Sequence, residues 1–252
     1  MKVVSFVNKK GGVGKTTLCL HLAAILASKG KQVLIIDNDG QCNITSTFNL
    51  DNSPQSLYDV MINPEYLFSS IEKTNIKNLD VVPNKEYYQD AITHITSEKG
   101  REFKLRNAIN NLKVKYDYIF IDCNPSMDLA FVNALVASNE VIIPIGVCAY
   151  SLTALSKVSN FIDKIKNKMN PSLEIKAFVL NDIDRRSNMD KSVAAGIDKA
   201  FPGKLAKTTI SRSSIFTKMQ FKKQTLVNNK LSKSYSEYKQ LLKELGYYGK
   251  KK

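Results

Sequence analysis

The chain has 252 residues, of which 43% are hydrophobic, enough to bury a substantial core in one α/β domain. Its longest apolar runs, such as residues 141–147, are too short to cross a bilayer, and we expect no secretory leader after Met1. The formal net charge is +14, and residues 199–252 hold 14 Lys and Arg against 2 Asp and Glu. This basic C-terminal segment predicts a polyanionic partner, nucleic acid or an anionic membrane, unless it is a solvated face kept for solubility.

Apolar runs alternate with helical patterns along the chain. The runs predict strands at residues 3–7, 33–36, 79–82, 118–121, 141–145 and 175–180. The helical patterns predict helices at residues 16–28, 102–112, 127–137 and 152–169, whereas residues 51–77 indicate loops and a short helix. Several of the strands are apolar throughout, as strands covered on both faces are. We therefore expect an α/β fold, a doubly wound and mostly parallel sheet, in one domain over residues 1–252.

A glycine-rich loop, NKKGGVGKTT, joins the first predicted strand to the first predicted helix. Glycines let backbone N–H groups turn inward around phosphate oxygens, and the N-terminus of the helix adds a positive dipole. This predicts a P-loop, with Lys15 on the β and γ phosphates and the Thr16 hydroxyl on Mg²⁺. The general P-loop pattern has a glycine where this chain has Lys9. The predicted nucleotide-binding residues of the loop are Lys10, Gly11, Gly12, Val13, Gly14, Lys15, Thr16 and Thr17.

Carboxylates end two further predicted strands. The sequence VLIIDNDGQCN places Asp37 and Asp39 after an apolar run, and YIFID places Asp122 in the same way, as in a Walker B strand that holds Mg²⁺ through water. A strand-end carboxylate near a γ-phosphate can align the attacking water. The alternatives are that Asp37 and Asp39 cap the next turn, and that Asp122 is a buried structural residue.

These motifs resemble those of one family. KGGVGKTT resembles the deviant Walker A motif of the ParA/MinD superfamily, and DNDGQCN resembles the ParA pattern DxDPQxN, with Gly40 in place of proline and Cys42 in place of glycine. IDCNPSMDLAFVNAL resembles a third ParA segment, with Asn124 in place of a proline. The chain is thus similar to the small type of ParA protein, which has a P-loop NTPase fold and no helix-turn-helix before the P-loop.

The resemblance also implies roles for single residues. Lys10 takes the place of the signature lysine, which reaches across a nucleotide-sandwich dimer to the partner's phosphates; the alternative is a solvated loop charge. Asp39 matches the aspartate that activates or orients water, so that Lys10, Lys15 and Asp39 form the catalytic set. Asp37 matches the aspartate near Mg²⁺, which together with Thr16 and Asp122 makes the metal set. Asn181 is a candidate adenine contact, or else a turn residue that ends a strand.

The function implied is an ATPase that uses ATP and Mg²⁺ as cofactors and forms a homodimer with ATP. In the family such dimers bind DNA without sequence preference and partition plasmid or chromosomal DNA with a ParB-like centromere-binding protein, in the cytoplasm on the nucleoid. The candidate DNA contacts in the basic segment are Arg212, Lys218, Lys222 and Lys223.

The alternative function is a MinD-like membrane-surface ATPase that positions cell-division or flagellar machinery. The C-terminal sequence LLKELGYYGKKK combines leucines and tyrosines with lysines, as a membrane-binding end does. DNDGQCN nevertheless fits the ParA form better, so we expect no stable membrane association. An iron–sulfur carrier of the same superfamily would need a CxxC motif, which the sequence lacks.

The cysteines and histidines complete the set of residues with reactive side chains. Cys19, Cys42, Cys123 and Cys148 lie on different predicted elements, so we expect reduced thiols rather than disulfides or metal ligands. His21 and His94 have no evident partner, and we expect structural or surface roles for both. The sequence therefore predicts neither a zinc site nor a Ser/His/Asp triad.

Overall fold

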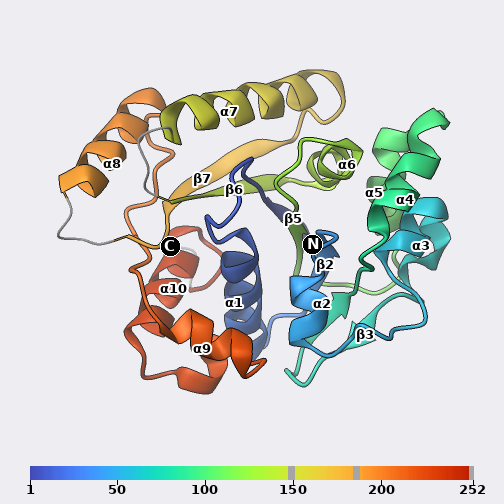
Figure 1. Cartoon of the computed structure of the whole chain (residues 1–252), viewed down its shortest axis with the longest axis horizontal. Helices are drawn as coiled ribbons and strands as arrows, with labels where there is room; N and C mark the ends of the chain where they lie inside the picture. Colours follow the sequence, from blue (N-terminus) through green and yellow to red (C-terminus); the bar gives the residue numbers. More distant parts are fainter. Residues whose placement is uncertain (147–150, 184–187, 250–252) are drawn as a thin grey trace.

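The computed structural model describes residues 1–146, 151–183 and 188–249, and Figure 1 shows a central sheet between two layers of helices. The sheet has seven strands in the order β3-β4-β2-β5-β1-β6-β7. Neighbouring strands pair in parallel, except that β3 is antiparallel to β4. The predicted doubly wound, mostly parallel sheet is confirmed. The strands are β1 (Lys2–Phe6), β2 (Val33–Asn38), β3 (Glu72–Lys73), β4 (Leu79–Val82), β5 (Tyr118–Cys123), β6 (Glu140–Ile145) and β7 (Glu174–Leu180).

Helices cover both faces of the sheet (Figure 1). One face carries α3 (Leu57–Ile62), α4 (Tyr88–His94), α5 (Lys104–Asn110), α6 (Leu129–Ala137), α7 (Ser151–Lys168) and α8 (Asn188–Ala200). The other face carries α1 (Lys15–Ser28), α2 (Asn43–Thr47), α9 (Ile215–Phe221) and α10 (Lys233–Glu244). Short 3₁₀ turns form at η1 (Pro64–Leu67), η2 (Ile95–Ser97), η3 (Arg101–Phe103) and η4 (Leu226–Asn229).

The sheet is held by an apolar cluster on each face. In β2, Leu34 and Ile36 belong to the cluster under α3–α8, and Val33 and Ile35 to the cluster under α1 and α10. Because side chains alternate between the faces of a strand, a strand covered on both faces must be apolar at every position. This requirement explains the continuous apolar runs in the sequence.

The predicted strands and helices match the structure except near their ends. The predicted helix at residues 102–112 is shorter, because residues 101–103 form the 3₁₀ turn η3 and α5 starts at Lys104. The helix predicted at 127–137 begins at Leu129, because the Asp128 carboxylate accepts a hydrogen bond from the Phe131 N–H at 3.1 Å and caps the first turn. Residues 51–77 contain α3, as expected, and the unpredicted edge strand β3.

Residues 204–212 run alongside the edge strand β7 and extend this side of the sheet. The Ala206 N–H donates to the Phe178 carbonyl at 2.8 Å, and the Ile210 N–H donates to the Leu180 carbonyl at 2.9 Å. Isolated parallel bridges join the same two stretches. The segment therefore ends beside the carboxyl end of β7, where Asn181 lies.

Two carboxylates of α10 bind this segment from the other side. Glu244 accepts hydrogen bonds from the Lys207 and Thr208 N–H groups at 2.6 and 2.9 Å. Glu237 accepts from the Ser211 N–H and hydroxyl at 3.0 and 2.7 Å. These are the two acidic residues of the basic C-terminal segment, so both of its negative charges serve to position the backbone.

Three of the four cysteines and both histidines lie in the described part of the chain. Cys19, Cys42 and Cys123 are free and buried, and Cys148 lies outside the described residues. His21 accepts a hydrogen bond from the Leu226 N–H at 3.4 Å, and burial lowers the pKa of His21 to about 3. His21 is therefore a neutral structural residue, and the other histidine lies at the surface.

Candidate nucleotide-binding site

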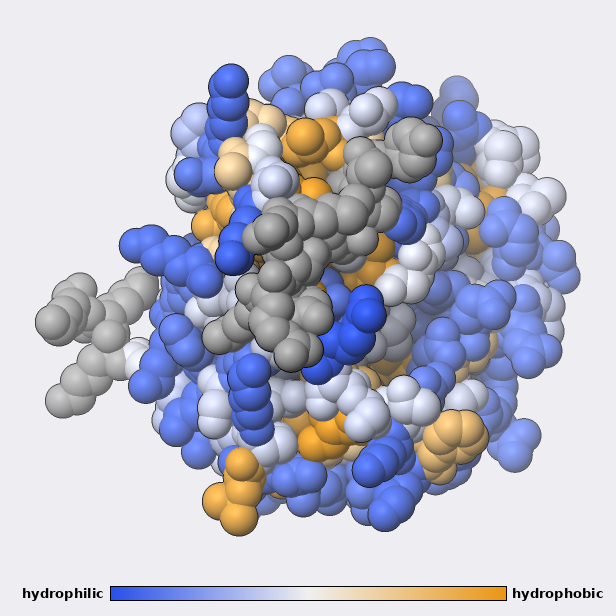
Figure 2. Space-filling model, turned by 60° about the vertical axis from the view of Figure 1, so that its left-hand side comes forward, coloured by the Kyte–Doolittle hydropathy of each residue, from blue (hydrophilic) through white to orange (hydrophobic). Residues whose placement is uncertain are grey.

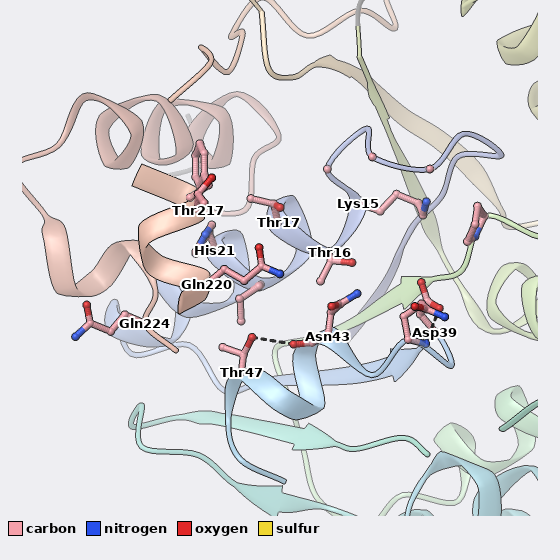
Figure 3. A pocket seen from close by; sticks show the side chains of 17 residues that line it. Lys15, Thr16, Thr17, His21, Asp39, Asn43, Thr47, Thr217, Gln220 and Gln224 are labelled. Atoms are coloured by element: carbon pink, nitrogen blue, oxygen red, sulfur yellow. Dashed lines mark hydrogen bonds between the residues drawn. The ribbon is translucent and has the colours of Figure 1, made fainter. Parts of the chain in front are cut away.

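A cleft of about 440 Å³ lies where the loop after β1 meets α2 and α9. In Figure 3, Lys15 and Asp39 lie on one side of the cleft, and side chains of α9 lie on the opposite side. The cleft is at the carboxyl edge of the parallel strands, where α/β sheets bind ligands. Its lining comprises Gly11, Gly12, Gly14, Lys15, Thr16, Thr17, Leu20, His21, Asp39, Gln41, Asn43, Thr47, Pro125, Phe216, Thr217, Gln220 and Gln224.

The predicted P-loop wraps around the start of α1. Gly12 and Gly14 have φ angles of 71° and 89°, in the left-handed region that favours glycine. The Lys15 ammonium is buried within the loop and donates to the Lys10 carbonyl at 3.3 Å. Burial lowers the pKa of Lys15, while the Asp122 carboxylate acts to raise it. Lys10, by contrast, is exposed to solvent.

Two asparagines fasten the P-loop to the neighbouring strands. Asn8 donates to the Pro144 carbonyl at 2.7 Å and accepts from the Lys10 N–H at 3.0 Å. Asn181, at the end of β7, donates to the Val13 carbonyl at 2.9 Å. Its carboxamide lies so close to Gly14 that an added Cβ would overlap it. Asn181 thus positions the loop, and its contact with adenine stays a prediction.

Two buried carboxylates lie side by side near Lys15, although neither is among the residues that line the cleft. Asp37 on β2 and Asp122 on β5 are partners in the parallel register, and neither is exposed to solvent. One Asp37 oxygen accepts from the Thr45 N–H and hydroxyl at 2.9 and 2.6 Å, and its Oδ1 has no hydrogen-bond partner. The Thr16 hydroxyl lies beside Asp122 and acts to lower the pKa of that carboxyl. Burial raises the pKa of Asp37 to about 6 and that of Asp122 well above its usual range.

These buried carboxylate oxygens and the nearby Thr16 hydroxyl fit Mg²⁺. Magnesium prefers oxygen ligands, and it is usually held by one or two carboxylates together with substrate phosphates and water. Within residues 1–146, 151–183 and 188–249, no three His, Cys, Asp or Glu side chains form a metal cluster. The fit is therefore to an ion shared with a phosphate ligand, with Thr16, Asp37 and Asp122 as the candidate protein ligands.

Asp39 lies on the wall of the cleft in a tight turn. Its Oδ1 accepts from the Gln41 N–H at 3.0 Å, and its carbonyl accepts from the Cys42 N–H at 3.0 Å. Cys42 has a φ of 53°, a left-handed conformation that is costly for a residue with a side chain. The ParA pattern has glycine at this position, because glycine adopts the left-handed conformation without steric cost. Gly40, where the pattern has proline, has only ordinary contacts around an added Cβ.

Two parts of the site were not predicted from the sequence. The Phe216, Thr217 and Gln220 side chains of α9 line the cleft, although they are some two hundred residues from the P-loop in the chain. Only the fold brings them there, and no local pattern could have revealed it. The second part is Thr45, whose hydroxyl donates to Asp37. The only sequence feature that could have pointed to Thr45 is its place two residues after the polar Asn43.

The candidate DNA contacts lie near the cleft but differ in environment. Arg212 forms an ion pair with Asp182 at 3.3 Å, so part of its charge is compensated. Lys218 lies on α9, with Lys222 and Lys223 directly after it, and all three side chains are exposed. Figure 2 shows that hydrophilic residues cover most of this side of the molecule.

The contact between Asn181 and Gly14 predicts a specific coupling. Gly12→Ala introduces only backbone strain, about 1–2 kcal/mol. Gly14→Ala adds the overlap with the Asn181 carboxamide and should lower the free energy of unfolding in urea by roughly 1–3 kcal/mol more. In an Asn181→Ala background this excess should disappear. An equal cost of Gly14→Ala in both backgrounds would show that the two residues do not interact.

Comparison with known proteins places the chain in a family. The model of a family described as "AAA domain" matches residues 1–175. The sporulation initiation inhibitor protein Soj of Bacillus subtilis is 36% identical over 214 residues, which cover 84% of this chain and 85% of Soj. The chromosome partitioning protein ParA of Myxococcus xanthus is 34% identical over 214 residues, covering 84% of this chain and 76% of that protein.

A solved structure agrees over nearly the whole chain. A candidate plasmid partition protein from Borrelia burgdorferi B31, bound to AMPPNP, has a TM-score of 0.83 and 27% identity. The alignment covers 96% of this chain and 97% of that protein. The family predicted from the P-loop and strand-end motifs is confirmed: the chain belongs to the ParA family of P-loop proteins.

Proposed function

We propose that the chain is one P-loop ATPase domain that dimerises with ATP, binds DNA without sequence preference and partitions plasmid or chromosomal DNA. The observation that carries this proposal is the grouping of charged side chains at the P-loop: Lys15 and Asp39 line the cleft, and the buried carboxylates Asp37 and Asp122 lie next to them. The B. burgdorferi relative binds an ATP analogue, which supports ATP as the ligand.

Each of these side chains has a role in phosphoryl transfer. Lys15 and the backbone N–H groups of the P-loop bind the phosphates of ATP. Thr16, Asp37 and Asp122 would hold Mg²⁺, which neutralises phosphate charge when bound. Asp39 accepts a hydrogen bond from the attacking water and aligns it with the γ-phosphate, so that its contribution is mainly orientation.

Lys10 is the residue proposed to act in the dimer. Its side chain is exposed on the loop that also carries the buried Lys15. A cation placed there can reach a second subunit that faces the cleft, whereas the Lys15 ammonium is turned into its own loop. The two lysines of the P-loop would therefore serve two different nucleotides.

The proposed DNA surface is the face formed by α9 and the residues after it. Both acidic residues of the basic segment are hydrogen-bonded to residues 207–211. Lys218, Lys222 and Lys223 are exposed on this face. Exposed cations of this kind bind phosphates without reading the bases. A role in partition is in keeping with the name of the M. xanthus relative. A ParB-like partner and a place in the cytoplasm on the nucleoid complete the proposal.

The membrane alternative receives less support from the structure. A membrane-binding C-terminal helix needs an exposed apolar face, but Leu241, Leu242, Leu245 and Tyr247 are buried against the sheet. No helix in the described part of the chain has the length and apolar character to cross a bilayer.

The first functional prediction concerns Lys15. Lys15→Ala should lower the affinity for Mg-ATP at least about a hundredfold, because it removes a charge-assisted contact to phosphate, and loss of the partner leaves buried groups unpaired. Isothermal titration calorimetry measures this directly. The matched control is Lys9→Ala, because Lys9 is exposed on the same loop. This variant should bind ATP as tightly as the wild type does. ATP affinity equal in both variants and the wild type would remove Lys15 from the site.

The second prediction separates Lys10 from Asp39. Lys10→Ala should bind ATP and stay monomeric, because the contact to the second subunit is lost. Asp39→Ala should bind ATP, form the dimer and remain in it, with kcat reduced by roughly a hundredfold or more, because only water alignment is lost. Light scattering with ATP and with ADP gives the oligomeric state. A dimer of Lys10→Ala, or a monomer of Asp39→Ala with ATP, would refute the assigned roles.

The third prediction concerns α9. The double variant Lys218→Ala/Lys222→Ala should bind random duplex DNA more weakly and equally so for all sequences. The slope of log K against log salt should decrease by roughly 0.9 for each phosphate contact removed. ATP hydrolysis without DNA should not change. Lys99→Ala/Lys113→Ala, which removes two exposed lysines near α5, is the control. If the two double variants bind DNA alike, the DNA surface is not on α9.

A further inference from the structure

The end of α9 carries an exposed aromatic residue among lysines. Phe221 is 86% exposed, the highest value among the aromatic side chains that the structure describes as exposed. Lys222 and Lys223 follow it directly, and Lys218 lies one helical turn before. Exposing so large an apolar side chain costs free energy unless a ligand covers it.

A hollow of about 500 Å³ opens beside Phe221, between the end of α9 and the residues after α2. The Lys223 ammonium donates to the Asn49 carboxamide at 2.5 Å across it. No acidic residue is among the described residues that line the hollow. Its lining comprises Phe48, Asn49, Asn75, Ile76, Phe221, Lys222, Lys223, Gln224, Thr225 and Asn228.

This combination of groups matches the phosphates, sugars and bases of a nucleic acid. Lysine ammonium groups pair with phosphates, and carboxamides hydrogen-bond to sugars, phosphates and base edges. An exposed aromatic ring adds a flat apolar face on which a base can stack. A lipid surface matches less well, because inserting Phe221 would bring four neighbouring carboxamides toward hydrocarbon, where they lose their hydrogen bonds to water.

We propose that Phe221 stacks on a base of the DNA whose phosphates the lysines of α9 bind. This inference rests on the proposed DNA binding and adds a preference to it: DNA that offers an unpaired or easily unstacked base binds more tightly than uniform duplex. Stacking is tolerant of sequence, since every base has a flat face, so the preference is for DNA structure and not for a base sequence.

The test compares three DNA ligands of equal length with Mg-ATP present: an intact duplex, a duplex with a single unpaired base, and a single strand. Phe221→Ala should bind the second and third ligands roughly tenfold more weakly than the wild type, and the intact duplex with a smaller loss. Phe221→Tyr should restore the affinity. The control is Phe68→Ala, which removes an aromatic ring that is 63% exposed directly after η1. This variant should bind all three DNA ligands as the wild type does.

A second variant, Phe221→Trp, tests the stacking by fluorescence. The chain has no tryptophan, so Phe221→Trp places a single fluorophore at the site. Stacking on a base should quench its emission with the single strand. A blue shift on anionic phosphatidylserine vesicles without quenching by DNA would overturn the proposal in favour of a lipid surface.

The outcomes distinguish this inference from the function on which it rests. Wild-type affinity of Phe221→Ala for all three ligands, with an unchanged melting temperature, would overturn the stacking role and leave DNA binding intact. Failure of the wild type to bind any of the three ligands with ATP would overturn both the inference and the proposed function.

Discussion

The burial of Asp37 and Asp122 side by side is the constraint on which the rest of the site depends. The parallel register of β2 and β5 makes the two carboxylates neighbours, and neither is exposed to solvent. Ionising two such groups without a countercharge is costly, and burial raises the pKa of both. Lys15 supplies one positive charge nearby, and the remaining imbalance favours a bound cation.

Thr45 connects this pair of carboxylates to the surface proposed to bind DNA. Its hydroxyl donates to Asp37 and accepts from the Asn84 N–H at 2.9 Å, so that α2 is held between β2 and the loop after β4. Asn49, just beyond α2, accepts from Lys223 after α9. Hydrogen bonds at the two ends of α2 thus place it between the buried carboxylate Asp37 and Lys223.

Much of the fold was predictable because burial on both faces of a sheet leaves a simple pattern. Residues 33–36 are apolar at every position, and Asp37, Asp39 and Asp122 follow such runs, so their meeting at one edge follows from parallel pairing. The role of α9 was not predictable, because its place at the cleft depends on contacts between distant segments. The same holds for Glu237, because no local sequence pattern predicts its hydrogen bonds with Ser211.

The central claim is that the nucleotide in the cleft controls the DNA surface, because a dimer doubles the number of phosphate contacts on one duplex. The most direct measurement is the affinity of the unmodified chain for random-sequence duplex with Mg-ATP, with Mg-ADP and without nucleotide, at several salt concentrations. The account predicts tight binding with Mg-ATP alone, weakening steeply as salt rises. Equal affinity in all three nucleotide states would contradict it.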